Sequence, residues 1–319
     1  LPALETAVIM KPVTVTPNGF RFQAGRVRYE VQVNKKGLDV LVNVPEPGAI
    51  RSLIPATLQR ALHFNHLDFW ERRAKSFIYD IFDYITQSSQ LSLHQTYVHA
   101  SSMERNGKAI ALLAWGGIGK TTSLLKLILE DGWNFLSDDL GLLDANGQLY
   151  RSPKNLQVYG YNLQGQPRIE SALFSKRTIL DALSWSFFRA IKGNHRVRRR
   201  ISAEKLFGKE RIAKSGQLSQ AFFLERHQGK DFRCERITAE ALADRCVAIL
   251  MHEISPYTLV ASAIHGAGNN KTILSPGKMY SETHKILVSA FSRVPCEVIS
   301  IPLDAGPNDL VAFLRPRID

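Results

Sequence analysis

The sequence predicts an α/β fold in which a phosphate-binding loop joins a buried strand to a helix. Residues 109–115 form a short apolar run without alternation, and a run of this length is typical of a strand covered on both faces. A glycine-rich turn follows, and residues 120–131 then carry apolar side chains at helical spacing. Residues 13–44 alternate between apolar and polar, which predicts a small antiparallel meander near the N-terminus.

The turn reads AWGGIGKTT and matches the Walker A pattern G-x-x-x-x-G-K-[ST], with Ala114 in place of the first glycine. In this pattern the loop amides and the helix N-terminus face an anion. We expect Lys120 to reach the β- and γ-phosphates of a nucleotide and Thr121 to offer its hydroxyl to Mg²⁺. The predicted nucleotide-binding residues are Trp115, Gly116, Gly117, Ile118, Gly119, Lys120, Thr121 and Thr122.

An acid pair follows the helix. Gly132 occupies the position of a left-handed helix cap, and residues 133–136 are predicted to form the next strand. Asp138 and Asp139 then lie at the carboxyl end of that strand, the edge where open α/β sheets bind ligands. We assign Asp138 to Mg²⁺, together with Thr121, and Asp139 to the base that accepts a proton from a hydroxyl. The two acids can also exchange these roles.

The order of these motifs resembles the HPr kinase/phosphorylase superfamily. His99 in VHASSM precedes the loop, and LSDDLGLLD, an Asn146-Gly147 turn and RSPKNLQVY follow it. The resemblance covers about residues 98–252 and is strongest to HPr-kinase-like serine kinases, some of which act on free serine or on ribosomally made peptides. It implies a P-loop kinase core on a mixed sheet of the phosphoenolpyruvate carboxykinase type. It also implies ATP and Mg²⁺ as cofactors, with His99 supporting the acid pair.

Two departures from that family shape the expected reaction. Thr122 stands where HPr kinases carry a glutamate, and the second HPr kinase signature has no counterpart here. The resemblance therefore implies a simple ATP-dependent kinase that transfers the γ-phosphoryl group to a serine hydroxyl. The acceptor is a peptide, a protein or a small molecule such as a free amino acid. Two alternatives stay open: a nucleotide-hydrolysing switch or nucleic-acid-associated ATPase, and a nucleotide-binding module without catalysis.

Residues 196–214 are the most basic segment, with eight Lys or Arg against two acids. The segment is a solvated face, a contact surface for an acidic partner, or a flap in which Arg198, Arg199 and Arg200 neutralise the transferred phosphoryl group. The net charge of +12 favours attraction to polyanions. No nucleic-acid-binding signature accompanies it, so a nucleic-acid partner is not favoured.

We expect two domains, an N-terminal β-plus-α lobe over residues 1–90 and a catalytic domain over residues 91–319. Within the lobe, residues 50–90 have helical periodicity, with predicted core positions at Phe69, Trp70, Phe77, Ile78, Ile81, Phe82 and Ile85. Beyond the acid pair we predict helices over 176–192 and 239–252, strands over 218–225 and 298–303, and a final helix near Asp309. The first of these helices carries Leu180, Leu183, Phe187 and Ile191 on one side.

Composition limits the class of protein. A hydrophobic content of 45% is enough to form a core and excludes disorder of the whole chain. No apolar run approaches the length of a membrane helix, and no signal peptide is evident. The three cysteines lack metal-ligand spacing, which indicates a reducing compartment, so we expect a cytoplasmic location. GAGNNKT, from Gly266, is predicted to be an exposed loop. The sequence leaves a homo-oligomer open.

Overall fold

The computed structural model describes residues 8–10, 13–34, 37–175, 177–268 and 274–318, and the chain divides into two compact units. Unit 1 comprises Leu1–Gln59, Leu67–Leu93 and Met251–Glu282, and unit 2 comprises Arg60–His66, His94–Leu250 and Thr283–Asp319. The boundary expected at residue 90 lies close to the end of the second stretch of unit 1. The segment Met251–Glu282, expected in the catalytic domain, instead groups with unit 1.

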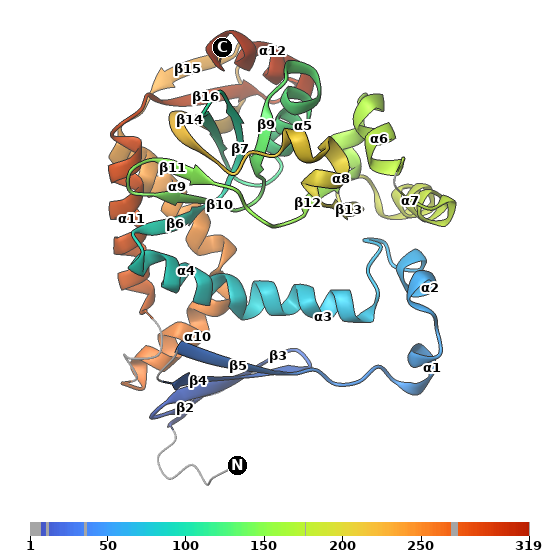
Figure 1. Ribbon diagram of the computed structural model, residues 1–319, viewed down its shortest axis with the longest axis vertical. Coiled ribbons are helices and arrows are strands. Elements are labelled where there is room, and N and C mark those ends of the chain that lie inside the picture. Colours follow the sequence, from blue (N-terminus) through green and yellow to red (C-terminus); the bar gives the residue numbers. More distant parts are fainter. Residues whose placement is uncertain (1–7, 11–12, 35–36, 176, 269–273, 319) are drawn as a thin grey trace. The chain divides into compact units, whose positions relative to one another are not determined.

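Unit 1 contains the predicted antiparallel meander (Figure 1). Its five strands pair in chain order, and their alternating apolar residues form one buried face that includes Val13, Val15, Phe20 and Phe22. The sequence also predicts a break in the meander at Lys35-Lys36, which lies outside the described residues. The strands are β1 (Val8–Met10), β2 (Val13–Thr16), β3 (Gly19–Ala24), β4 (Val27–Asn34) and β5 (Gly37–Asn43).

The helical stretch after the meander is confirmed, but its buried face is narrower than predicted. Phe69 and Ile81 are buried, whereas Trp70 is 57% exposed and Phe82 is 43% exposed. A π-helical turn ends at Phe82 and breaks the 3.6-residue period on which the prediction depended. The helices of this stretch are α1 (Ala49–Ser52), α2 (Ala56–Ala61), α3 (Phe69–Phe77), η1 (Ile78–Phe82) and α4 (Asp83–Ser92). Unit 1 also contains α10 (Ser255–Gly266).

Unit 2 is built on a nine-stranded mixed sheet, so the expected mixed α/β architecture is confirmed. The strand order is β6 (Gln95–Val98), β10 (Gly141–Asp144), β11 (Gln148–Tyr150), β14 (Ser215–His227), β8 (Lys108–Leu113), β7 (Ala100–Arg105) and β9 (Asn134–Ser137). β14 also pairs with β16 (Cys296–Pro302), which pairs in turn with β15 (Arg233–Arg236). β14 is parallel to β8 and β16, and the other described pairings in this sheet are antiparallel.

The position of β7 determines which strand ends lie at the same edge of the sheet. β7 is antiparallel to both β8 and β9, so β8 and β9 run in the same direction. Ser101 pairs with Leu112 near the end of β8, and Ser102 pairs with Ser137 at the end of β9. The carboxyl ends of β8 and β9 therefore share one sheet edge with the beginning of β7.

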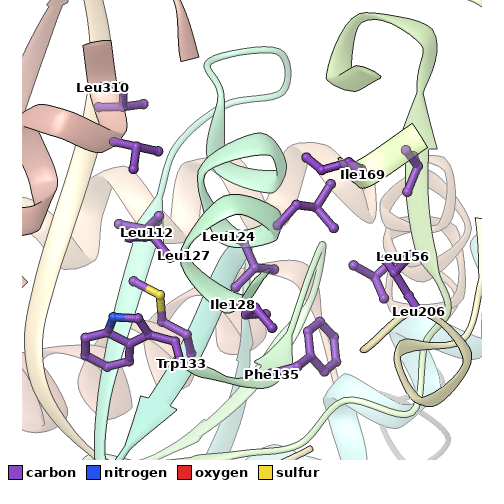
Figure 2. Packing of buried hydrophobic residues seen from close by; sticks show 14 of the residues in the cluster. Leu112, Leu124, Leu127, Ile128, Trp133, Phe135, Leu156, Ile169, Leu206 and Leu310 are labelled. Atoms are coloured by element: carbon purple, nitrogen blue, oxygen red, sulfur yellow. The ribbon is translucent and has the colours of Figure 1, made fainter. Parts of the chain in front are cut away.

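The predicted helix over residues 120–131 is α5 (Lys120–Asp131), which ends at Gly132 with the expected left-handed cap, φ 76°. α5 packs on β7 and against α12 (Pro307–Ile318). Figure 2 shows the core that results, in which Leu124, Leu127 and Ile128 of α5 lie among buried apolar side chains from the sheet and from α12. This packing fixes the first turn of α5 at the sheet edge described above.

A second, two-stranded sheet pairs β12 (Leu156–Tyr159) with β13 (Arg198–Ile201). The helix α7 (Ile179–Lys192) confirms the prediction for residues 176–192, and it turns Asp181, Ser184 and Trp185 inward. Its apolar side is largely open: Leu180, Leu183, Phe187 and Ile191 are 47%, 64%, 59% and 59% exposed. The neighbouring short elements are η2 (Gly160–Leu163), α6 (Pro167–Phe174), α8 (Ala203–Phe207) and η3 (Lys209–Arg211).

The helices α9 (Ala239–Glu253) and α11 (Pro276–Phe291) complete the described elements. No single described helix is long and apolar enough to cross a membrane, although Ala239–Glu253 and Tyr257–Gly266 reach that length and composition together as a bent pair. Most of the predicted GAGNNKT loop lies outside the described residues.

Candidate functional site

The glycine-rich turn leaves the end of β8 and leads into α5. Gly117 and Gly119 have φ values of 80° and 118°, in the left-handed region that glycine adopts without strain. A Cβ on Gly119 would lie 3.3 Å from the Leu310 side chain, so α12 closes the loop on that side. Trp115, Gly116 and Gly117 are exposed, and Ile118 is half-buried. The loop thus presents its backbone to solvent at the N-terminus of a helix, the geometry of an anion site.

Lys120 is folded back onto this loop. Its Nζ donates hydrogen bonds to the carbonyl oxygens of Ala114 at 2.6 Å and Trp115 at 2.9 Å, and the side chain is buried. Burial raises the pKa of Asp138, and the charge of Lys120 opposes that rise. The ammonium group is therefore held against the loop carbonyls, and its charge acts on Asp138 of the acid pair.

Thr121 and Asp138 are in direct contact. The Thr121 hydroxyl lies 3.0 Å from Oδ1 and 3.2 Å from Oδ2 of Asp138, and the Ser101 hydroxyl donates to Oδ1 at 2.5 Å. Sequence reasoning missed Ser101. Its side chain reaches the site because β7 begins between the ends of β8 and β9, and the only sequence signal was its polar character within an otherwise buried strand.

Burial raises the pKa of Asp138 to about 6, and the charge of Asp139 adds to this rise. The hydrogen bonds from Ser101 and Thr121 and the charge of Lys120 act in the opposite direction. At neutral pH the carboxyl is ionised, but its charge is poorly solvated. Such a group gains from a cation placed beside it.

Asp139 differs from its neighbour in exposure and in backbone. Its side chain is 26% exposed, and its φ of 76° lies in a region that non-glycine residues rarely adopt. Backbone strain of this kind is concentrated at functional sites. The more accessible carboxylate of the pair is thus the one assigned as base from the sequence.

His99 lies beside Asp139, with 3.7 Å between its Nδ1 and Asp139 Oδ1, which is beyond hydrogen-bond length. Burial lowers the pKa of His99 to about 3, and the nearby charges of Lys120 and Lys154 contribute. The imidazole is therefore neutral at physiological pH. Lys154, on the loop between β11 and β12, is a second cation at the site that sequence reasoning missed.

Thr122 has a different environment from Thr121. Its hydroxyl accepts a hydrogen bond of 2.6 Å from the Asn162 side chain, and the main-chain N–H of Tyr159 donates to Asn162 Oδ1 at 2.7 Å. The Thr122 side chain thus links η2 to α5. Asn162 had no recognisable sequence signal.

The three consecutive arginines separate into two kinds. Arg199 is fully buried and pairs with Asp181 at 2.6 Å, with a further hydrogen bond to the carbonyl of Phe64. A role in a mobile flap therefore does not fit Arg199. Arg198 and Arg200 are half-buried on the other side of β13, as strand alternation requires.

The donor set suits Mg²⁺ better than a metal that needs several side-chain ligands. The described residues contain no group of three or more His, Cys, Asp or Glu that could hold a metal ion. Mg²⁺ is usually bound by one or two carboxylates together with phosphate oxygens and waters. The Thr121 hydroxyl and the buried Asp138 carboxylate, already in contact, are compatible with that arrangement.

The similarity of this chain to known proteins is distant. No family model matches the sequence, and no curated protein matches it. Among solved structures, the Hpr(Ser) kinase/phosphatase from Coxiella burnetii is similar over 70% of this chain and 95% of its own, with 14% sequence identity and a TM-score of 0.29. The relationship is a distant structural one.

Proposed function

We propose that this protein is a kinase that binds ATP with Mg²⁺ at residues 114–122 and transfers the γ-phosphoryl group to a serine hydroxyl. The acceptor is a peptide, a protein or a free amino acid. One observation carries the proposal: Thr121 at the start of α5 contacts the buried Asp138, and a second, more exposed carboxylate follows directly. Phosphoryl transfer to a hydroxyl needs an acid that binds the metal and an accessible base that accepts the hydroxyl proton.

The phosphate side of the site uses charges that are already in place. Lys120 would exchange its two carbonyl acceptors for phosphate oxygens, and the N-terminus of α5 would face the same negative charge. Mg²⁺, when bound by Thr121 and Asp138, would offset negative charge on the phosphates. Its charge would also favour the ionised form of Asp138, whose pKa is raised by burial.

The acceptor side depends on Asp139. Its carboxylate is partly open to solvent and would accept the proton of the incoming serine hydroxyl. The neutral His99 alongside does not compete for this proton, because a pKa of about 3 makes its imidazole a weak base. The remaining requirement is that the acceptor be held in line with the γ-phosphate, since phosphoryl transfer depends mainly on positioning and charge stabilisation.

The proposal is tested with Lys120→Ala and Asp139→Asn, and with Lys230→Ala as a control for the loss of one exposed lysine. ATP binding is measured by calorimetry, and transfer is measured with labelled ATP on serine peptides and on free serine. We expect Lys120→Ala to lose ATP binding. Asp139→Asn should retain binding while transfer falls by about 10²- to 10⁴-fold, the range for loss of a general base.

Two outcomes contradict this function. ATP binding that survives unchanged in Lys120→Ala would remove the phosphate-loop assignment. ATP turnover that proceeds at full rate without any acceptor, and is unaffected by Asp139→Asn, would instead identify a nucleotide-hydrolysing protein.

A further inference from the structure

A line of side chains extends from η2 to β13. The rings of Tyr161 and Tyr159 stack with centroids 5.3 Å apart and planes 15° apart. The ring centroid of His195 also lies 5.3 Å from that of Tyr161. The Arg198 guanidinium lies 5.2 Å from the Tyr159 ring centroid and donates a hydrogen bond to the Tyr159 hydroxyl. We call Tyr161, Tyr159 and Arg198 the tyrosine–arginine ladder.

The ladder is fastened to the phosphate loop. Asn162 follows Tyr161, and its side chain bonds both the Thr122 hydroxyl and the main chain of Tyr159. β12 and β13 hold the other end, because Tyr159 and Arg198 are directly paired across these strands. The ladder is therefore held in place at both ends, by Asn162 at the phosphate loop and by the pairing of β12 with β13.

The Tyr161 end of the ladder is the end near the metal-binding acid. The charges of Asp138 and Arg198 both act on the Tyr161 phenol, whose pKa is raised to about 12, chiefly by burial. The Arg198 guanidinium packs on the Tyr159 ring and donates to the Tyr159 hydroxyl, at the other end of the ladder.

One polar group of the ladder lacks a charged partner, and another lacks a hydrogen-bonding partner, among the described residues. Among the described residues, the Arg198 guanidinium contacts a phenol and a ring and has no carboxylate partner. The Tyr161 hydroxyl makes no hydrogen bond to any described residue. Arg199, its neighbour on β13, is by contrast neutralised by Asp181. A partly exposed guanidinium without a carboxylate partner is available to bind an anionic group of a ligand.

We propose that the tyrosine–arginine ladder is the acceptor-binding wall of this kinase and selects an acceptor whose hydroxyl lies near a carboxylate. The inference rests on the proposed function, which assigns the γ-phosphate to Lys120 and Thr121. An anion at Arg198 is then a separate group of the acceptor, because the hydrogen bond and ring contact of that guanidinium are with Tyr159 and not with Lys120, Thr121 or Asp138. The rings would pack against the carbon atoms of the acceptor, and Arg198 would bind its carboxylate.

Two sources of that carboxylate share this chemistry, and matched probes separate them. L-serine against L-serinamide tests the α-carboxylate of a free amino acid. N-acetyl-Ser-Glu-amide against N-acetyl-Ser-Gln-amide tests an acidic neighbour in a peptide. For at least one pair, we expect the wild-type protein to show a KM about 10- to 100-fold lower for the carboxylate than for the amide, the range for loss of a charge-assisted hydrogen bond.

The variants are Arg198→Gln, Arg198→Lys and Tyr161→Ala, with Arg196→Ala as the control for loss of an exposed arginine next to β13. Arg198→Gln should abolish the preference for the carboxylate while leaving the KM for ATP unchanged, and Arg198→Lys should retain part of it. Tyr161→Ala should weaken both members of a pair alike. Arg196→Ala should match the wild-type protein, and thermal unfolding of each variant checks that it folds.

The proposal is overturned if the wild-type protein treats both members of both pairs equally. It is also overturned if Arg198→Gln raises the KM for ATP as much as that for the acceptor, since Arg198 would then face the nucleotide. Calorimetry with the four probes in the absence of nucleotide measures the preference for the carboxylate as a difference in affinity, independently of turnover. A preference for carboxylate that Arg198→Gln removes supports the ladder, even if Lys120→Ala shows that the nucleotide assignment is wrong.

Discussion

Replacing Asp138 with asparagine should stabilise the folded protein at neutral pH while it removes the proposed magnesium ligand. The hydroxyls of Ser101 and Thr121 lie 2.5 Å and 3.0 Å from the same carboxylate oxygen, Oδ1. An asparagine with its amide oxygen at that position can accept from both hydroxyls. The substitution therefore removes a buried negative charge and retains the two hydrogen bonds to Oδ1, while the longer Thr121 contact to Oδ2 is lost.

The size of the effect follows from the pKa of Asp138, about 6 against an ordinary value of 3.8. The difference of roughly two units corresponds to about 3 kcal/mol, because each unit is about 1.4 kcal/mol. The folded state holds this proton more tightly than the unfolded chain, so ionisation disfavours folding. The penalty is absent below about pH 4, grows as the pH rises through about 6, and is complete above about pH 7.

The assay is urea denaturation of the wild-type protein and of Asp138→Asn at several pH values, with Asp231→Asn as a control for loss of an exposed carboxylate. The free energy of unfolding of Asp138→Asn should exceed that of the wild-type protein by about 3 kcal/mol near pH 7.5. The two should converge near pH 4. A difference that does not change with pH, or an asparagine variant that is less stable at pH 7.5, would refute the reasoning.

Three further substitutions test the packing around the site. Arg199→Ala should lower the free energy of unfolding in urea denaturation by about 3 kcal/mol, because Asp181 stays buried with fewer partners. The double variant with Asp181→Ala should lose less free energy of unfolding than the sum of the losses of the two single variants. Asn162→Ala should cost about 1–3 kcal/mol by the same assay, since it leaves the buried Thr122 hydroxyl without its partner; an unchanged stability would contradict this. Gly119→Val should weaken ATP binding in calorimetry, because a side chain at φ 118° is strained and would crowd α12; undiminished binding would show that the loop conformation is not needed.

Features set by neighbouring residues were predictable from the sequence. The limits of α5 agree with the prediction, because apolar spacing and a glycine cap are local signals. The hairpin at Asn146-Gly147, between β10 and β11, is confirmed for the same reason. The separation of Arg199 from its two neighbours was also readable in principle, since alternation along a strand places it on the opposite face.

Features set by distant residues were not predictable. Ser101 reaches Asp138 through the register of β7 between two other strands, and one sequence carries no signal for that register. Asn162 meets Thr122 across 40 positions of the chain. Periodicity correctly places Leu183 and Phe187 on one side of α7, but it does not show that this side is open. Spacing tells which residues share a face, and only the fold tells what covers it.

The long central strand β14 has a consequence for synthesis of the chain. It pairs with β8, β11 and β16, yet it begins at Ser215, more than a hundred positions after β8 begins at Lys108. While the ribosome extends the chain between these strands, β8 and β11 have open edges, which are the usual starting points for association between chains. The segment that carries the phosphate loop is made early but cannot complete its sheet until β14 emerges. Nascent chains arrested before His227 should therefore depend on chaperones, and full-length chains much less.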